Sequence, residues 1–186
     1  MPFITTEFPG LLVFEPAVYT DDRGFFFESY NEQTWQKQGI DIRFVQDNQS
    51  FSNYGVIRGL HYQLDPYAQT KLLRVLVGRI LDVAVDIRKG SPTFGKYMAI
   101  ELSAENKKQF LIPAGFAHGF SVLSETAEVS YKCDAFYHKE SECGIRYDDP
   151  ALNIDWGVPP GKAIVSTKDL ELPDFANCRN NFQFNR

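Results

Sequence analysis

The strongest constraint that this sequence places on its fold is the alternation of apolar and polar residues at every second position. From Leu81 to Arg88 the odd positions are all apolar, and three of the four even positions are charged. Val129, Tyr131 and Cys133 alternate with polar neighbours in the same way. Successive side chains of a β-strand point to opposite faces, so the pattern predicts strands that bury one face and expose the other.

Similar segments recur along most of the chain, and turn signals such as Gly78-Arg79 separate them. They lie near residues 11–14, 24–30, 43–51, 57–63, 71–77, 95–103 and 107–113. Helices are few. Asn31 can cap a helix over residues 32–38 that Gly39 ends, a weaker signal lies at residues 148–152, and residues 174–186 read as a loose extension. The pattern therefore predicts an all-β protein, an antiparallel barrel or sandwich with one ligand site in an open mouth.

Length and composition narrow the classes of protein further. A chain of 186 residues with 44% hydrophobic content can bury roughly 70% of its unfolded surface, so we expect one domain over residues 1–186. No apolar run reaches the roughly 20 residues that span a bilayer, and the N-terminus lacks the pattern of a signal peptide, which predicts a cytoplasmic protein. The three cysteines are odd in number, which fits reduced thiols. A net charge of −5 argues against nucleic-acid binding.

The three histidines are candidate metal ligands. His118 lies in a Pro-x-Gly-x-x-His segment that resembles the second metal-binding motif of cupins. The first cupin motif needs a His-x-His pair, whereas Tyr62 and Gln63 follow His61, and His138 is a poor third candidate. A barrel without a metal or other cofactor is the expectation, and a metal cupin such as a dioxygenase remains the alternative that loss of activity with chelators would favour.

Several longer segments carry a more specific resemblance. They are Asp22 to Tyr30, Phe44 to Asn48, Arg58 to Gln63, Asp82 to Arg88, Ser91 to Gly95, Pro113 to Phe120, Tyr131 to Cys133 and Lys168-Asp169. In these segments, which fall between Ile4 and Pro173, the chain resembles the dTDP-4-dehydrorhamnose 3,5-epimerase family. The resemblance implies a cupin-type jelly-roll barrel that inverts C3 and C5 of dTDP-4-dehydro-6-deoxy-D-glucose without a cofactor. The product would be dTDP-4-dehydro-L-rhamnose, on the route to dTDP-L-rhamnose.

The resemblance also assigns roles to individual residues. His61 is implied as the base that removes a proton beside the ketone, and Asp169 orients its imidazole. Tyr131 is implied as the acid that reprotonates the enolate from the opposite face. A phenol with an ordinary pKa of about 10 can hold that proton at neutral pH. Lys71 is implied to face the enolate oxygen, where a fixed positive charge lowers the barrier.

The nucleotide half of the substrate needs cations for its diphosphate and an aromatic ring for its base. By resemblance Arg23, Arg58 and Lys168 contact the substrate, and Tyr137 stacks on thymine. Further matched substrate-binding positions are Glu28, Gln46, Asp47, Asn48, His118 and Glu142. The overall negative charge does not exclude a diphosphate, because a ligand responds to the few cations within its own pocket.

One difficulty follows from strand geometry. Arg58 and His61 are three residues apart, so in a regular strand their side chains point to opposite faces. Either Gly59 introduces an irregularity, or a second subunit contributes one of the binding residues. The family resemblance implies a homodimer in which N-terminal strands cross between subunits, so Arg23 or Glu28 can act in the partner's pocket.

Two alternatives to the double epimerase remain open besides the metal cupin. Related enzymes invert only C3 or only C5 with much the same base and acid, so a single-site dTDP-4-keto-sugar epimerase is the nearest alternative. A non-catalytic barrel that binds a sugar nucleotide is the other. The joint presence of His61, Lys71, Tyr131 and Asp169 argues against it, since a binding module needs no opposed acid and base.

Overall fold

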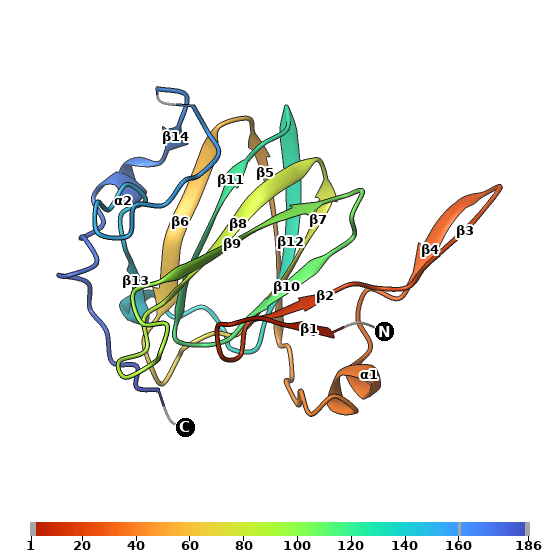
Figure 1. Ribbon diagram of the computed structural model, residues 1–186, viewed down its shortest axis with the longest axis horizontal. Helices are drawn as coiled ribbons and strands as arrows, with labels where there is room; N and C mark the ends of the chain where they lie inside the picture. The colour runs from red at the N-terminus through yellow and green to blue at the C-terminus, as the bar shows by residue number, and fades with distance from the viewer. Residues whose placement is uncertain (1–2, 160, 185–186) are drawn as a thin grey trace.

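The alternating segments form two β-sheets that face each other (Figure 1). The computed structural model describes residues 3–159 and 161–184. The first sheet has the strand order β1 (Phe3–Thr5), β2 (Leu12–Phe14), β10 (Gln109–Ile112), β7 (Lys71–Val77), β12 (Thr126–Cys133) and β5 (Gln46–Asn53). The second has the order β13 (Glu142–Gly144), β6 (Val56–Gln63), β11 (Phe116–Val122), β8 (Arg79–Asp86) and β9 (Tyr97–Ser103), with the short parallel β14 (Ile164–Val165) beside β6. The predicted all-β antiparallel architecture is confirmed.

The main core lies between these sheets and takes side chains from both. Its buried members include Leu73, Val75, Ile80, Ala84, Phe110, Phe116, Phe120 and Val129. Because strand side chains alternate, polar residues two positions away point into the same interior. These inward polar residues are Lys71 on β7, Asp82 on β8, His118 on β11 and Tyr131 on β12. The barrel is therefore apolar over most of its length and polar where these side chains gather.

β8 is buried on both faces, so the expectation of a half-buried strand is wrong for this segment. The odd-numbered side chains pack under the C-terminal part of the chain, in a second core that includes Trp156 and Phe182. On the other face Asp82 and Asp86 have exposed fractions of 0%. Buried carboxylates need partners in place of water, and each of these two has them.

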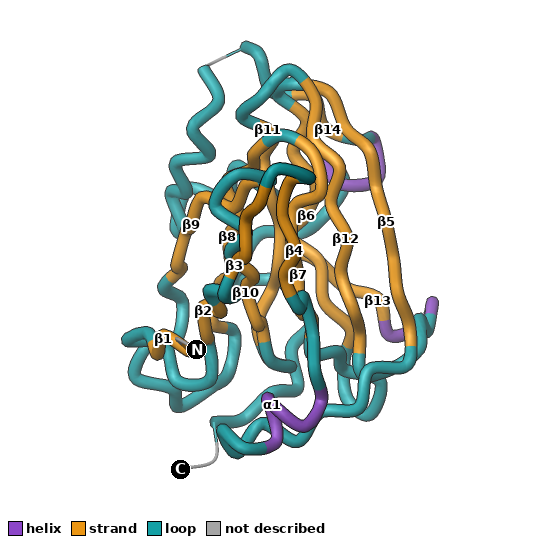
Figure 2. The backbone as a smooth tube through the Cα atoms, turned by 90° about the vertical axis from the view of Figure 1, so that its right-hand side faces the viewer, coloured by secondary structure: helices purple, strands orange, loops and turns teal. Residues whose placement is uncertain are grey.

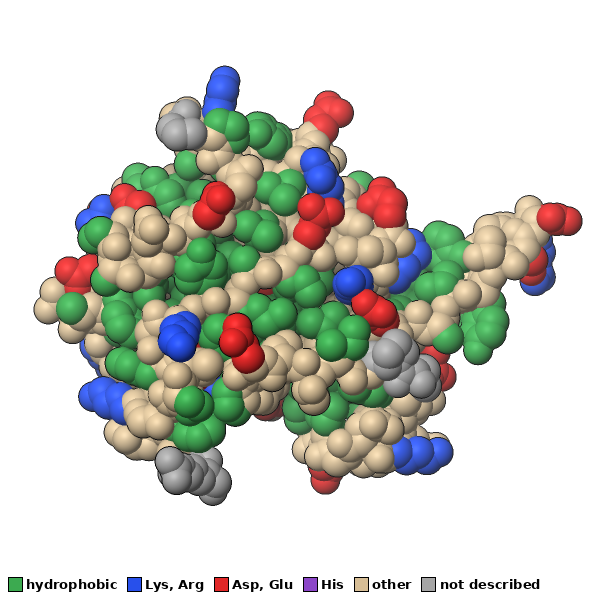
Figure 3. Space-filling view, viewed as in Figure 1, with side chains coloured by type: hydrophobic (Ala, Val, Ile, Leu, Met, Phe, Trp, Pro, Cys, Tyr) green, Lys and Arg blue, Asp and Glu red, His purple; other side chains and the backbone are tan. Residues whose placement is uncertain are grey.

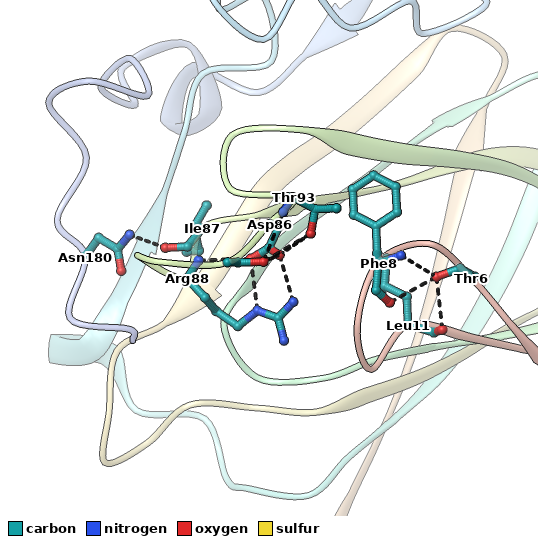
Figure 4. A network of polar contacts seen from close by, with 9 residues as sticks. Thr6, Phe8, Leu11, Asp86, Ile87, Arg88, Thr93 and Asn180 are labelled. Carbon is teal, nitrogen blue, oxygen red and sulfur yellow. Dashed lines mark hydrogen bonds and ion pairs between the residues drawn. The ribbon is translucent and has the colours of Figure 1, made fainter. Parts of the chain in front are cut away.

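The partners of Asp86 tie β8 to the loop that follows it (Figure 4). Arg88 donates to both carboxylate oxygens at 2.9 and 2.7 Å, and the hydroxyls of Ser91 and Thr93 add bonds of 2.6 and 2.7 Å. Burial alone would raise the pKa of Asp86, but these bonds outweigh it and hold the pKa below the ordinary value. The Arg88 guanidinium also lies over the ring of Phe184, 5.0 Å from its centroid, so the C-terminal extension packs against the barrel.

A hairpin of β3 (Val18–Asp21) and β4 (Gly24–Phe27) projects away from the barrel (Figure 1). Tyr19, Phe25 and Phe26 have exposed fractions of 67%, 60% and 70%. Hydrophobic side chains along the projection are visible in Figure 3. An exposed apolar surface of this kind on a projecting element is typical of an interaction site.

Helix α1 (Glu32–Gln36) follows the hairpin and lies beneath the first sheet in Figure 2. Asn31 caps it as expected, accepting from the Thr34 amide. The helix ends two residues earlier than the predicted residue 38. Gly39, with φ of +77°, then allows the Ile40 amide to reach back to the Trp35 carbonyl at 3.1 Å, which closes the end in the manner of a Schellman motif.

The second expected helix, over residues 148–152, is a turn. The Asp149 carboxylate accepts from the amides of Ala151 and Leu152 at 2.8 and 2.9 Å, so the side chain closes the turn. One main-chain bond of the helical type, from the Asn153 amide to the Asp149 carbonyl at 2.9 Å, does not extend into a helix. The pattern did not signal helix α2 (Thr167–Leu170), which Ser166 caps. It also did not signal β1, β3, β13 and β14, all of which are only two to four residues long.

Candidate active site

Three of the four inward polar side chains, Lys71, His118 and Tyr131, line a cavity with two adjoining lobes of about 400 and 490 Å³. Both lobes share His61, Lys71 and Tyr131. The first lobe is also lined by Gln46, Asn48, Tyr62, Gln63, Gln69, Tyr137 and Glu142. The second is also lined by Ser50, Val56, Ile57, Arg58, His118, Phe120, Ile164, Val165, Ser166, Lys168 and Asp169. The residues that the resemblance implies as base, acid and enolate-stabilising lysine thus lie where the two lobes meet.

A register shift in β6 lets Arg58 and His61 face the same cavity. His61 lies opposite His118 and Arg58 lies opposite Phe120, so Gly59 and Leu60 of β6 together lie opposite Gly119 of β11. Gly59 carries this β-bulge with φ of +120°, and a Cβ there would lie 2.6 Å from the Cα of Gly119. The first of the two explanations offered for the spacing of Arg58 and His61 is therefore found in the structure.

His61 forms a dyad with Asp169. Its Nε2 lies 2.7 Å from Asp169 Oδ1, and the other carboxylate oxygen accepts from the Gly59 amide at 3.3 Å. Burial alone would raise the pKa of Asp169, but its bonds to His61 and Gly59 outweigh burial and hold the pKa below the ordinary value. Because an ionised carboxylate can only accept, Nε2 of His61 donates to Asp169, and Nδ1 is the ring nitrogen outside this bond.

Tyr131 and Lys71 belong to the sheet opposite His61. Burial raises the pKa of the Tyr131 phenol, so this group keeps its proton at neutral pH. Burial lowers the pKa of Lys71, even though Cys133, Asp82 and Glu142 act in the opposite direction. The His61 imidazole on one sheet therefore lies across from a phenol and an amine on the other, at the space that both lobes share.

A second group of charges lies at one side of the first lobe. Glu142 accepts from the Tyr137 hydroxyl at 2.8 Å and from Lys168 Nζ at 2.7 Å. Burial alone would raise the pKa of Glu142, but these two bonds keep it below the ordinary value, and the bond to Glu142 raises the pKa of Lys168. Tyr137 is 54% exposed as a residue, so its side chain is accessible to a flat ligand.

His118 has a partner that the sequence did not indicate. Its Nε2 lies 3.0 and 3.1 Å from the two oxygens of Asp82, whose exposed fraction is 0%. The alternation of Asp82 with apolar neighbours predicts that it lies on the solvent-facing side of its strand. The alternation also holds for a strand whose polar side chains point into the barrel interior, so only the barrel's closure distinguishes the two cases.

Comparison with known proteins identifies the family. The family model described as dTDP-4-dehydrorhamnose 3,5-epimerase matches residues 5–177. The chain belongs to this family. A dTDP-4-dehydrorhamnose 3,5-epimerase from Shigella flexneri is 53% identical over 96% of this chain and 98% of its own. The fold is accordingly the cupin-type jelly-roll that the resemblance implied.

Solved structures of the epimerase family superpose closely on this chain. A dTDP-6-deoxy-D-glucose-3,5-epimerase from Legionella pneumophila, in complex with dTDP-4-keto-L-rhamnose, has a TM-score of 0.90 and 50% identity over 95% of this chain and 93% of that one. A 3'-monoepimerase from Streptomyces bikiniensis, in complex with dTDP-quinovose, has a TM-score of 0.85 and 31% identity over 92% of this chain and 86% of that one. The same barrel therefore occurs with both double and single epimerases.

Three sequence-predicted binding residues of this epimerase chain lie outside its own cavity. Asp47 points away from the barrel interior, because it alternates along the strand with Gln46 and Asn48, which line the cavity. It forms an ion pair of 3.0 Å with Lys132. Arg23 lies on the projecting hairpin with a side chain 90% exposed. Glu28 follows that hairpin and accepts from Asn31 Nδ2 at 3.0 Å.

The remaining observations concern metal ligands, thiols and membrane helices. Within residues 3–159 and 161–184, no cluster of three His, Cys, Asp or Glu side chains is arranged to hold a metal ion. Cys133, Cys143 and Cys178 are free thiols. Across the same described residues, none of the helices has the length and apolar character needed to cross a membrane.

Proposed function

We propose that this chain inverts C3 and C5 of dTDP-4-dehydro-6-deoxy-D-glucose and forms dTDP-4-dehydro-L-rhamnose, through enolates at the C4 ketone. The observation that carries the proposal is that His61, on one sheet and bonded to Asp169 of helix α2, lies opposite Tyr131 on the other sheet. Inversion requires a proton to leave one face of the carbon and another to arrive at the opposite face. The two sheets supply these two groups across one cavity.

In this proposal each step of the epimerisation is assigned to a residue of the cavity. Nδ1 of His61 accepts the proton from the carbon beside the ketone, and Asp169 stabilises the imidazolium through Nε2. Lys71 carries the positive charge that stabilises the enolate oxygen. Tyr131 donates its phenolic proton to the other face of the carbon, which completes the inversion.

The other cavity residues suit the nucleotide diphosphate. Arg58 is held by Ser52 at 3.0 Å, and its planar guanidinium can bond two phosphate oxygens. Lys168 adds a second cation at the edge of the second lobe. Tyr137 offers its exposed face to thymine, while Gln46, Asn48, His118 and Glu142 line the space between base and sugar. No metal or cofactor is needed for this proton chemistry.

Incubation with dTDP-4-dehydro-6-deoxy-D-glucose in D2O tests the proposal. We expect deuterium at both C3 and C5, read by NMR, because each inversion replaces a carbon-bound proton with one from solvent. Deuterium at one carbon only would favour the single-site alternative, for which the similarity to the Streptomyces bikiniensis 3'-monoepimerase is the specific observation. No exchange at either carbon would leave a binding protein without this activity.

We further propose that the enzyme is a homodimer in which the hairpin β3–β4 of one subunit completes the cavity of the other. Arg23 is 90% exposed at the hairpin, and the hairpin's aromatic side chains are uncovered in the isolated chain. Burying these rings against a second copy would remove apolar surface from water and bring Arg23 and Glu28 to a diphosphate in the partner's pocket.

Mixed dimers test this arrangement. Arg23→Ala and His61→Ala proteins are each expected to be inactive, whereas mixing and refolding them together should restore about a quarter of the wild-type activity. Half of the dimers are then mixed, and one of the two pockets in each mixed dimer is intact. Mixtures of His61→Ala with Lys71→Met are the matched control. They should stay inactive, because both changes lie in the pocket of their own chain. Inactivity of the Arg23→Ala mixture as well would place Arg23 in its own chain's pocket.

A further inference from the structure

The segment that carries Tyr137 is irregular, yet it is held in place by glutamine side chains. Residues 134–138 lie between β12 and the short 3-10 turn at Lys139–Ser141, and they belong to no strand. Within the described part of the chain, the main-chain groups of residues 135–137 form no bond with another main-chain group. Phe136 and Tyr137 have exposed fractions of 69% and 54%. An exposed segment of this kind is ordinarily mobile.

Three glutamines supply the missing bonds, each from a different part of the fold. Gln69 Nε2 donates to the Ala135 carbonyl at 2.8 Å, and Gln63 Nε2 donates to the Phe136 carbonyl at 3.2 Å. The Tyr137 amide donates to Gln46 Oε1 at 3.0 Å, and the next amide, of His138, donates to Gln63 Oε1 at 2.8 Å. Four consecutive residues are thus each bonded by a side-chain amide. We call Gln46, Gln63 and Gln69 the glutamine clamp.

The orientation of the clamp's amides follows from the chemistry of their partners. A main-chain N–H can only donate, so the Gln46 oxygen must face Tyr137, and its nitrogen is left to donate to Asn48 Oδ1 at 3.0 Å. Gln63 is 4% exposed, which leaves its amide few partners besides this segment and the Tyr67 carbonyl at 2.6 Å. A buried amide costs free energy unless it is bonded, so the clamp and the segment hold each other in one arrangement.

From these contacts we infer that the glutamine clamp positions Tyr137 as a preformed platform for the nucleobase of the substrate, an inference that rests on the proposed function. Tyr137 is fixed at both ends, because the clamp holds its main chain while Glu142 holds its hydroxyl at 2.8 Å. A platform ordered before binding does not have to lose that freedom when the base stacks on it. Gln63 and Gln69 are thereby positioning residues, and Gln46 acts on the base through Tyr137.

Binding of dTDP without a sugar isolates this effect from catalysis. Gln46→Met and Gln69→Met are each expected to raise the Kd for dTDP roughly 3- to 10-fold, the range for loss of one hydrogen bond. KM for the sugar nucleotide should rise with the Kd, while kcat changes by no more than about twofold, since the platform lies away from the reacting carbons. Gln49→Met is the matched control, because Gln49 lies on the same strand and bonds Glu128 on the outer face.

A double-mutant cycle with Tyr137→Ala separates positioning from direct contact. In the Tyr137→Ala background the two clamp substitutions should have no further effect on the Kd for dTDP, because the ring that they position is gone. Additive effects would overturn the inference and make Gln46 or Gln69 a direct contact of the nucleotide. An unchanged Kd in Tyr137→Ala itself would overturn it as well. Absence of deuterium exchange in the wild type would instead contradict the proposed function and leave the dTDP measurements as a valid test of the clamp.

Discussion

In D2O, the His61→Ala protein is expected to incorporate deuterium at C3 and C5 of the substrate roughly 10²- to 10⁴-fold more slowly than the wild type. His61 lines the cavity, and its Nε2 lies 2.7 Å from the Asp169 carboxylate on helix α2. The substitution removes from β6 the imidazole to which the proposed function assigns the proton abstraction. Binding of dTDP should persist, because Tyr137, Arg58 and Lys168 are unchanged.

His138→Ala is the matched control for this prediction. Its ring stacks on Tyr67 with 3.7 Å between centroids, outside the lining of both lobes, and its main-chain amide stays bonded to Gln63 after the substitution. Exchange close to the wild-type rate is therefore expected. Near-native exchange in His61→Ala would show that another group removes the proton, and the role assigned to Asp169 would be lost with that of His61.

Asp169 shows how far sequence could predict this site. The resemblance placed Asp169 beside His61, although the two are 108 residues apart. No pattern predicted that Ser166 would cap a helix of four residues and so fix the carboxylate there. Short helices carry too few positions for a periodic signal, and their existence depends on the packing around them.

The strand pattern predicted the positions of the principal strands better than the environment of their faces. Alternation located β8 correctly but assigned Asp82 and Asp86 to solvent. In the closed barrel, His118 and Arg88 replace water as their partners. The same ambiguity affects β5. Asp47 faces outward, whereas its neighbours Gln46 and Asn48 line the cavity. Period two says which residues share a face, and only the closure of the sheets decides which face is inside.

The glutamine clamp had no sequence signal at all. Gln46, Gln63 and Gln69 are polar residues in or beside strands, and a pattern cannot show that their amides meet at one irregular segment. Side-chain bonds to main-chain groups depend on geometry between distant parts of the chain. In the projecting hairpin, the pattern predicts a strand at residues 24–30, but it does not show that Phe25 and Phe26 lie away from the barrel with exposed fractions of 60% and 70%.

Replacing Lys71 with methionine is expected to lower kcat roughly 10²- to 10³-fold, the cost of removing one charged donor from a developing oxyanion. Methionine has a similar length and no charge, so substrate binding should change little. Burial lowers the pKa of Lys71 in the wild type, which means that the charged form of Lys71 destabilises the folded state. The Lys71→Met protein should therefore unfold at a higher temperature, by about 2–4 °C if the gain is roughly 1 kcal/mol.

The pH dependence of the wild type gives an independent measure of the same charge. Because the pKa of Lys71 is lowered from 10.5, its proton is lost at a lower pH than that of an ordinary lysine, and kcat should fall as the pH rises through that point. Lys71→Arg keeps a cation that does not titrate in this range, so its lower kcat should stay level at alkaline pH where that of the wild type declines. A Lys71→Met protein that is less stable than the wild type, or that keeps near-native kcat, would contradict this role. Either result would show that the lysine supports the barrel or the binding step, while stabilisation of the enolate would then fall to Tyr131 and the other donors of the cavity.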